Sequence, residues 1–272
     1  MLGILTDLET AIRQHDVGQI NQLLQQLGKT PFLNKSKPTP YDEAVSLCWY
    51  LENVFYTAVP AILMRLATEL NVPVNEWPNP QLITIGFWPG GDRDGNPFVT
   101  ADITQKVAAR LHESLLRCYL RDIRQLRRRL TFYGVDQLIA EIEQQVSDAL
   151  AQRKLLEIDV LLASLHNARK VLLNEHDGLF LPLLDAFLMK VNVFGRHFAC
   201  LDVRQDSRKH DAVWRVLLET SHEQNKSLRW SEFQALDAHE QIRVLLEMRF
   251  NPVFLTFTDE LTNETLRTLR AI

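Results

Sequence analysis

The sequence predicts a mainly α-helical chain with two short strands, and two observations support this fold class. Apolar residues recur at three- and four-residue spacing over long stretches, and only 10 glycines and 11 prolines interrupt the 272 residues. Two short runs, Leu82–Phe87 and Phe198–Val203, have the length and the β-branched or apolar content of buried strands. Each run leads directly into a charged loop.

Composition narrows the class of protein. The chain is 46% hydrophobic, which suits a sizeable core, and its net charge of −4 argues against general affinity for nucleic acid or an anionic membrane. No segment reaches the roughly 18 uninterrupted apolar residues of a membrane helix, and no leader pattern begins the chain, so we expect a soluble, cytoplasmic protein. Cys48, Cys118 and Cys200 are odd in number and far apart, which predicts buried thiols rather than disulfides or a zinc site.

The first part of the chain is expected to be helical on both sides of a polar connector. Residues 4–28 form one or two amphipathic helices, and residues 28–40 form the connector. Thr39, followed by a proline and two acidic residues, is a good helix start. The helix that begins there runs to about Asn71, with a kink or a break expected at Pro60.

The middle of the chain holds both predicted strands. A proline-rich extended segment, Val72–Pro80, precedes the first strand. After the loop, Thr100 or Asp102 caps a helix that runs to about Tyr133, where Gly134 is the stop signal. Further helices are predicted over residues 136–152, 155–174 and 178–194.

Helices also account for the end of the chain. Ser207 opens one helix, and the last helix starts at about Asp259. Between them, two pairs have the spacing of a capping box before apolar residues. These pairs are Ser231 with Gln234, and Asp237 with Glu240.

Two strands that each deliver a charged loop favour either a minor sheet within a helical domain or a piece of a larger barrel. Functional groups gather at the carboxyl ends of the strands in such barrels. Two strands alone cannot close one.

The segment Phe87–Thr100 is the strongest candidate site. Its glycines allow positive φ and close backbone approach, its prolines fix φ, and its charged and amide side chains supply polar atoms. The residues that shape this loop are Gly90, Gly91, Asp92, Asp94, Gly95 and Asn96. Trp88 either walls off a small anion from water or packs in the core.

Two other interpretations of this loop stay open. Asp92–Asn96 is similar to the opening of a calcium loop, but Pro97 stands where that loop needs glycine and Ile103 where it needs glutamate. In a purely structural interpretation, the flanking aspartates pair with Arg93 and the glycines form a tight corner.

Arg204 follows the second predicted strand. Arginine presents planar, bidentate donors that stay charged, which suits phosphate or carboxylate. An ion pair with Asp202 or Asp206 is the alternative.

One predicted helix carries a basic stripe at helical spacing. Such stripes can bind nucleic acid, but here aromatic residues are not interleaved and acidic residues lie close by. A solvated or subunit-facing helix is therefore the favoured interpretation. The stripe contains Arg117, Arg121, Arg124 and Arg128, with Arg127 and Arg129 beside it.

Three collinear segments resemble the phosphoenolpyruvate carboxylase family. The strongest is Phe87–Thr104, FWPGGDRDGNPFVTADIT, which closely resembles a signature of that family. Residues 37–44, KPTPYDEA, with Glu52-Asn-Val54 after them, and residues 201–210, LDVRQDSRKH, resemble two further segments. The family usually has methionine at Pro89, isoleucine at Val203 and glutamate at Asp206.

The resemblance implies a mostly helical enzyme built around an eight-stranded barrel, two of whose strands are those predicted here. This carbon–carbon lyase carboxylates phosphoenolpyruvate with bicarbonate to oxaloacetate and phosphate, using Mg²⁺ or Mn²⁺, in anaplerotic carbon fixation that feeds the tricarboxylic acid cycle. By the family pattern, Arg204 contacts the phosphate and Trp88 lies near the bicarbonate pocket. Arg93, with Asp92 and Asp94, binds or shapes the neighbouring site.

The family's catalytic histidine segment, Thr-Ala-His-Pro-Thr-Glu, and its Gly-Arg-Gly-Gly loop do not occur in this sequence. We therefore expect residues 1–272 to be a single internal fragment, inactive alone, with no catalytic residue and no metal ligand of its own. Within it we distinguish N-terminal helices (1–80), the strands with their site loops (81–210) and C-terminal helices (211–272). The parent is expected to be a homotetramer. The alternative is a non-catalytic helical module that binds anions or regulates.

Overall fold

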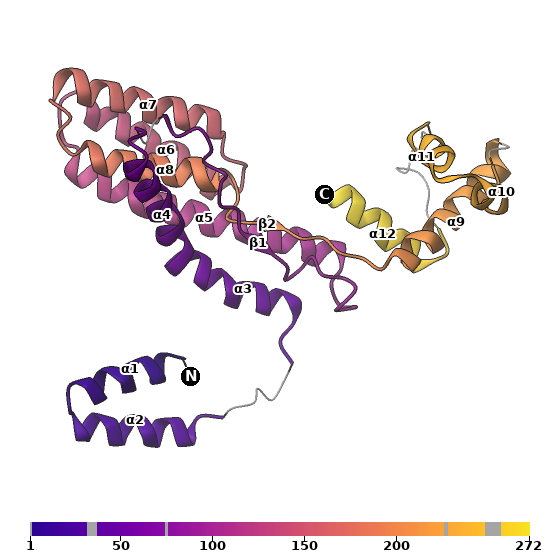
Figure 1. The fold of residues 1–272 in the computed structure, drawn as a ribbon, viewed down its shortest axis with the longest axis horizontal. Coiled ribbons are helices and arrows are strands. Elements are labelled where there is room, and N and C mark those ends of the chain that lie inside the picture. The colour runs from indigo at the N-terminus through magenta and orange to yellow at the C-terminus, as the bar shows by residue number, and fades with distance from the viewer. Residues whose placement is uncertain (1, 32–36, 74–75, 226–227, 248–256) are drawn as a thin grey trace. The chain divides into compact units, whose positions relative to one another are not determined.

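The computed structural model describes residues 2–31, 37–73, 76–225, 228–247 and 257–272 (Figure 1). The chain forms two compact units, Met1–Pro38 and Thr39–Ile272. The first unit contains the helical hairpin α1 (Leu2–Arg13) and α2 (Val17–Lys29), so residues 4–28 form two helices. Much of the predicted connector, residues 32–36, lies outside the described residues, as do residues 74–75 of the extended segment.

In the second unit, Thr39 caps α3 (Pro40–Tyr50) as predicted. Its hydroxyl accepts from the Asp42 backbone N–H at 3.2 Å, and the Asp42 carboxylate accepts from the Thr39 backbone N–H at 3.0 Å. A π-helical turn, η1 (Leu51–Phe55), then leads into α4 (Tyr56–Glu69).

A kink or a break was predicted at Pro60, and the chain does not break there. Helix α4 runs through Pro60. The irregular turn is η1, which directly precedes α4. Because proline has no N–H, it cannot bond to the carbonyl four residues before it, and a neighbouring π-turn is one way for a helix to accommodate such a defect.

The stretch Pro40–Glu69 is long and apolar enough to cross a membrane by length and composition, with a mean hydropathy of 1.2. The core helices of soluble proteins meet the same criterion. About a third of this stretch is buried within the chain.

The core lies among four long helices that Figure 1 shows packed side by side. Helix α5 packs on α6, α6 on α7 and α7 on α8, while α4 also covers α8. The four helices are α5 (Ala101–Arg129), α6 (Val135–Gln152), α7 (Ile158–Glu175) and α8 (Leu181–Phe194). Leu115, Ile139 and Leu165 are fully buried between them.

Thr100 is the N-cap of α5, as predicted, because its hydroxyl accepts from the Ile103 N–H at 3.4 Å. Gly134 does not end that helix, which already stops at Arg129. Instead Gly134, with φ +79°, immediately precedes α6. Its freedom to adopt positive φ serves the start of the next helix.

The two predicted strands are present but much shorter than expected. They are β1 (Gly86–Phe87) and β2 (Cys200–Leu201), which pair in parallel with Gly86 opposite Cys200 and Phe87 opposite Leu201. Cys200 is exposed, whereas Cys48 and Cys118 are buried as expected. Each strand has one partner among the described residues, and of their four residues Phe87 is the one that is buried.

In the described residues after β2, the chain forms the helices α9 (Ser207–Asn225), α10 (Trp230–Ala235), α11 (Ala238–Glu247) and α12 (Glu260–Ala271). Asp237 accepts from the Glu240 N–H at 2.9 Å, so the cap predicted there is confirmed. Asp259, predicted as the approximate start of the last helix, accepts from the Thr262 N–H at 2.8 Å and is the N-cap of α12. Ser231 lies inside α10 instead of capping it, because the Glu232 carboxylate accepts from the Arg229 N–H one residue before the helix.

Candidate functional site

The loops that follow β1 and β2 are joined by backbone hydrogen bonds beyond the ends of the strands. The Arg204 N–H donates to the Gly91 carbonyl at 3.0 Å, and the Arg93 N–H donates to the Arg204 carbonyl at 3.1 Å. Asp92 and Arg204 thereby form an isolated parallel bridge. The sequence therefore brings its two predicted site segments together at the carboxyl ends of the strands.

Two glycines make this approach possible. A Cβ on Gly91 would lie 2.1 Å from the Asp202 carbonyl oxygen, so no other residue fits without moving backbone. Gly90 has φ +82°, and a Cβ there would lie 2.5 Å from Val107 of α5. The Gly90 carbonyl accepts from the Thr104 hydroxyl at 2.6 Å, which ties the loop to that helix.

The tip of the loop is organised by its own polar groups. The Asn96 side-chain oxygen accepts from the Phe98 N–H at 3.1 Å, forming an Asx turn. A hydrogen bond shared with the Asp94 carboxyl raises the pKa of Asp92, and the same bond lowers the pKa of Asp94. A Cβ on Gly95 would lie 3.2 Å from the Asp92 carboxylate, so a side chain there would press on this pair.

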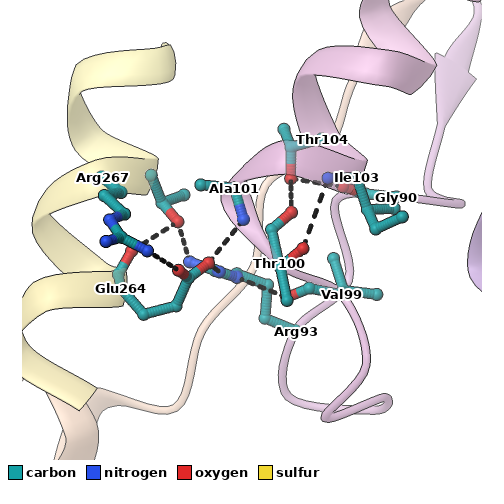
Figure 2. Close-up of polar contacts among 10 residues, drawn as sticks. Gly90, Arg93, Val99, Thr100, Ala101, Ile103, Thr104, Glu264 and Arg267 are labelled. Atoms are coloured by element: carbon teal, nitrogen blue, oxygen red, sulfur yellow. Dashed lines mark hydrogen bonds and ion pairs between the residues drawn. The ribbon is translucent and has the colours of Figure 1, made fainter. Parts of the chain in front are cut away.

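Arg93 is buried, with 6% of its surface exposed, and its donors are occupied by protein groups. Its Nε donates to the Val99 carbonyl at 3.0 Å and its Nη2 to Glu264 at 2.7 Å (Figure 2). Its Nη1 donates to the Thr268 hydroxyl. The predicted partners, the flanking aspartates, are therefore replaced by groups of α12. No local pattern in the sequence indicates this pairing across 171 residues.

Trp88 and Arg204 face solvent. Trp88 is 48% exposed, which excludes simple core packing. The Arg204 guanidinium lies 3.3 Å from Asp202, and 58% of its side chain is exposed. Asp206 pairs with Arg208 instead of Arg204, and the hydrogen bonds from Arg208 lower the pKa of Asp206 to about 2. Arg204 thus has one weakly held acidic partner and remains accessible to an anion.

A cavity of about 630 Å³ lies near the strands but does not include these two side chains. Its lining comes from the segment before β1, from α5 and from the turn between α8 and β2, including Ile83, Leu111 and His197. Neither Trp88 nor Arg204 lines it.

The described residues contain no group of three or more His, Cys, Asp or Glu side chains placed to hold a metal ion. Asp92 and Asp94 supply only two carboxyls, whose interaction raises the pKa of Asp92 and lowers the pKa of Asp94. The described part of this chain therefore does not fit a divalent metal centre.

The arginine stripe on α5 is largely engaged in ion pairs. Arg117 pairs with Glu113 at 2.6 Å, and Arg124 and Arg127 both pair with Glu143 of α6, at 3.1 and 2.8 Å. This arrangement supports the structural interpretation of the stripe.

Fold and site together define a class: a mainly helical protein in which a parallel pair of strands brings a glycine-rich charged loop beside an arginine. Its sequence matches the family profile of phosphoenolpyruvate carboxylase over residues 5–157 and 134–272. The chain belongs to the phosphoenolpyruvate carboxylase family, which confirms the resemblance seen in its motifs.

Three similar curated proteins are larger than this chain. The chain is similar to the phosphoenolpyruvate carboxylase of Psychromonas ingrahamii, with 28% identity over 246 residues covering 76% of this chain and 27% of the relative. The enzyme of Vibrio atlanticus is 30% identical over 77% of this chain and 27% of its own length. The enzyme of Shewanella halifaxensis is 31% identical over a stretch that covers 74% of this chain and 26% of that enzyme. The chain thus spans about a quarter of the length of these relatives.

Proposed function

We propose that this chain forms the phosphate-binding edge of a phosphoenolpyruvate carboxylase active site, with Arg204 as the ligand of the substrate phosphate. The observation that carries the proposal is the backbone bridge from Gly91 and Arg93 to Arg204, which presents an exposed guanidinium beside the glycine-rich loop. Arginine is suited to this role because its planar fork donates two hydrogen bonds and keeps its charge.

The residue types agree with the chemistry of the family. Transfer of the phosphoryl group from phosphoenolpyruvate to bicarbonate creates carboxyphosphate and an enolate, and fixed cationic donors stabilise the negative charge that develops. In this proposal Arg204 binds the phosphate and Trp88 shields the bicarbonate pocket from water. Arg93 is buried and each of its three side-chain nitrogens donates to a protein group, so in this proposal it shapes the site rather than touching substrate.

The Mg²⁺ or Mn²⁺ of the family would supply Lewis-acid stabilisation of negative charge in the parent enzyme. Its ligands are expected outside the residues described here, which do not fit such a centre. We therefore expect no oxaloacetate from the isolated chain with phosphoenolpyruvate, bicarbonate and Mg²⁺. The parent is expected to be a cytoplasmic homotetramer.

Calorimetric titration with phosphoenolpyruvate tests the binding role. Arg204→Ala should weaken binding at least tenfold, about 1.4 kcal/mol. Arg208→Ala is the matched control, because Arg208 is more exposed and pairs with Asp206. An equal loss in both variants, or no binding by the unaltered chain, would contradict the proposal.

The alternative function is a non-catalytic module that binds anions or regulates. The exposure of Arg204, 58% of its side chain, favours this alternative, since a catalytic phosphate site normally excludes water. Replacing the matching segment of the Vibrio atlanticus enzyme with this chain separates the two. Carboxylation by the chimera supports the enzymatic role, and phosphoenolpyruvate binding without turnover supports the module.

A further inference from the structure

We propose that Glu264, on the last helix, is a positioning residue that holds both ends of the site loop with one carboxylate. This loop runs from Arg93, whose backbone N–H bonds to Arg204, to Ala101, the first residue of α5. Glu264 contacts the chain at both points (Figure 2). The contacts themselves do not depend on which ligand the loop binds.

The first contact neutralises a buried charge. Glu264 Oε1 accepts from Arg93 Nη2 at 2.7 Å, where Arg93 is 6% exposed and the Glu264 side chain 24%. A buried guanidinium that loses its carboxylate partner is strongly unfavourable, because its charge is then neither hydrated nor paired. Loss of the Glu264 carboxylate would therefore weaken the hold on Arg93 within the loop.

The second contact is at the start of α5. The same Oε1 accepts from the Ala101 backbone N–H at 2.5 Å. The first N–H groups of a helix have no partner within the helix, and the helix dipole favours negative charge there. One carboxylate thus satisfies a helix N-terminus and an arginine that is eight positions earlier in the chain.

Thr268 completes the arrangement one helical turn further along α12. Its hydroxyl accepts from Arg93 Nη1 and donates to the Glu264 carbonyl at 3.0 Å. Arg267, with a guanidinium nitrogen 3.9 Å from Glu264 Oε2, adds a weak second cation. The Arg93 side chain is therefore held at two of its three nitrogens by α12.

Helix α12 also packs against α9, the helix that follows Arg204. It therefore contacts the helices that follow each of the two site loops. Because the Arg93 N–H donates to the Arg204 carbonyl at 3.1 Å, displacement of Arg93 would remove one of the two backbone hydrogen bonds that hold Arg204 beside the loop. This last step rests on the proposed function, since it makes Glu264 a determinant of phosphate affinity.

Hydrogen exchange measured by mass spectrometry tests the positioning role in the full chain. Glu264→Gln should speed exchange at least tenfold in peptides covering residues 93–101, and it should leave the buried amides of α6 and α7 unchanged. Glu260→Gln is the matched control, because Glu260 is an exposed glutamate in the first turn of the same helix. Unchanged loop exchange in Glu264→Gln would overturn the proposal.

A second pair of variants covers the case in which Glu264→Gln fails to fold. Thr268→Val should also speed exchange of the loop, whereas Thr268→Ser, which restores the hydroxyl, should return it to the rate of the unaltered chain. Equal exchange in these two variants would contradict the role assigned to α12.

Phosphoenolpyruvate titration of the same variants separates this inference from the proposed function. If the unaltered chain binds phosphoenolpyruvate, Glu264→Gln should weaken binding at least fivefold and Glu260→Gln should not. Faster loop exchange with no binding by the unaltered chain sustains the positioning role and rejects the phosphate site. Faster loop exchange with unchanged affinity rejects the link from Glu264 to Arg204.

Discussion

At the residue scale, the site depends on close backbone approach at Gly91. Its N–H donates to the Trp88 carbonyl at 2.9 Å, and its carbonyl accepts from the Arg204 N–H at 3.0 Å. A side chain would collide with the Asp202 carbonyl, which belongs to the backbone and cannot rotate away. The absence of a side chain, rather than unusual φ, is therefore what this position requires.

Gly91→Ala should lower the free energy of unfolding by about 2 kcal/mol or more, because relieving the clash separates the two loops. Gly86→Ala is the control in the adjacent strand, where a Cβ would meet its nearest atom at an ordinary 3.5 Å. Urea denaturation compares the two. Similar stability of both variants would show that the loops approach less closely than described.

At the element scale, Glu143 links α5 to α6 by pairing with two arginines. Hydrogen bonds from Arg127, and then from Arg124, lower its pKa. A carboxylate whose pKa is lower in the folded chain stabilises folding above its unfolded pKa, near 4.5, and loses that effect as the pH falls through the folded value.

Glu143→Gln should therefore lower stability by about 0.5 kcal/mol at pH 7, a small effect because both arginines are more than half exposed. The difference from the unaltered chain should disappear at about pH 3. Urea midpoints at the two pH values provide the measurement. A difference that persists in acid would assign the effect to packing rather than to charge.

At the scale of the whole molecule, α3 and α4 expose a number of large apolar side chains. Trp49 is 54% exposed, Ile62 50% and Leu66 37%. Water in contact with such surface is unfavourable, and contiguous apolar patches bind apolar dyes or other proteins.

Ile62→Ser with Leu66→Ser should reduce anilinonaphthalene sulfonate fluorescence of the folded chain, and should cost less stability than removal of a fully buried side chain, since both side chains are partly exposed. Leu63→Ala, one position along but fully buried, should instead cost about 2–5 kcal/mol. Dye fluorescence and thermal unfolding distinguish the two. Undiminished fluorescence in the serine variant would place the dye-binding surface elsewhere.

Local sequence patterns predicted the elements of this protein well because they reflect local free energies. The caps at Thr39, Thr100 and Asp237 were predicted because each needs only a side-chain oxygen and a backbone N–H two or three residues later. The long helices of the core followed from apolar spacing alone. The motifs around Trp88 and Arg204 also sufficed to indicate the family.

Tertiary structure alone decided the rest. The observed strands have only two residues each, fewer than predicted, because pairing with a neighbouring strand, rather than β-branched content, sets where a strand ends. The partner of Arg93 turned out to be Glu264 instead of an adjacent aspartate, because a buried charge takes whichever carboxylate the packing of helices brings to it. The sequence by itself determined which residues form helices and which family the chain belongs to. What holds the site loop was decided by tertiary packing, which brings together two residues 171 positions apart in the chain.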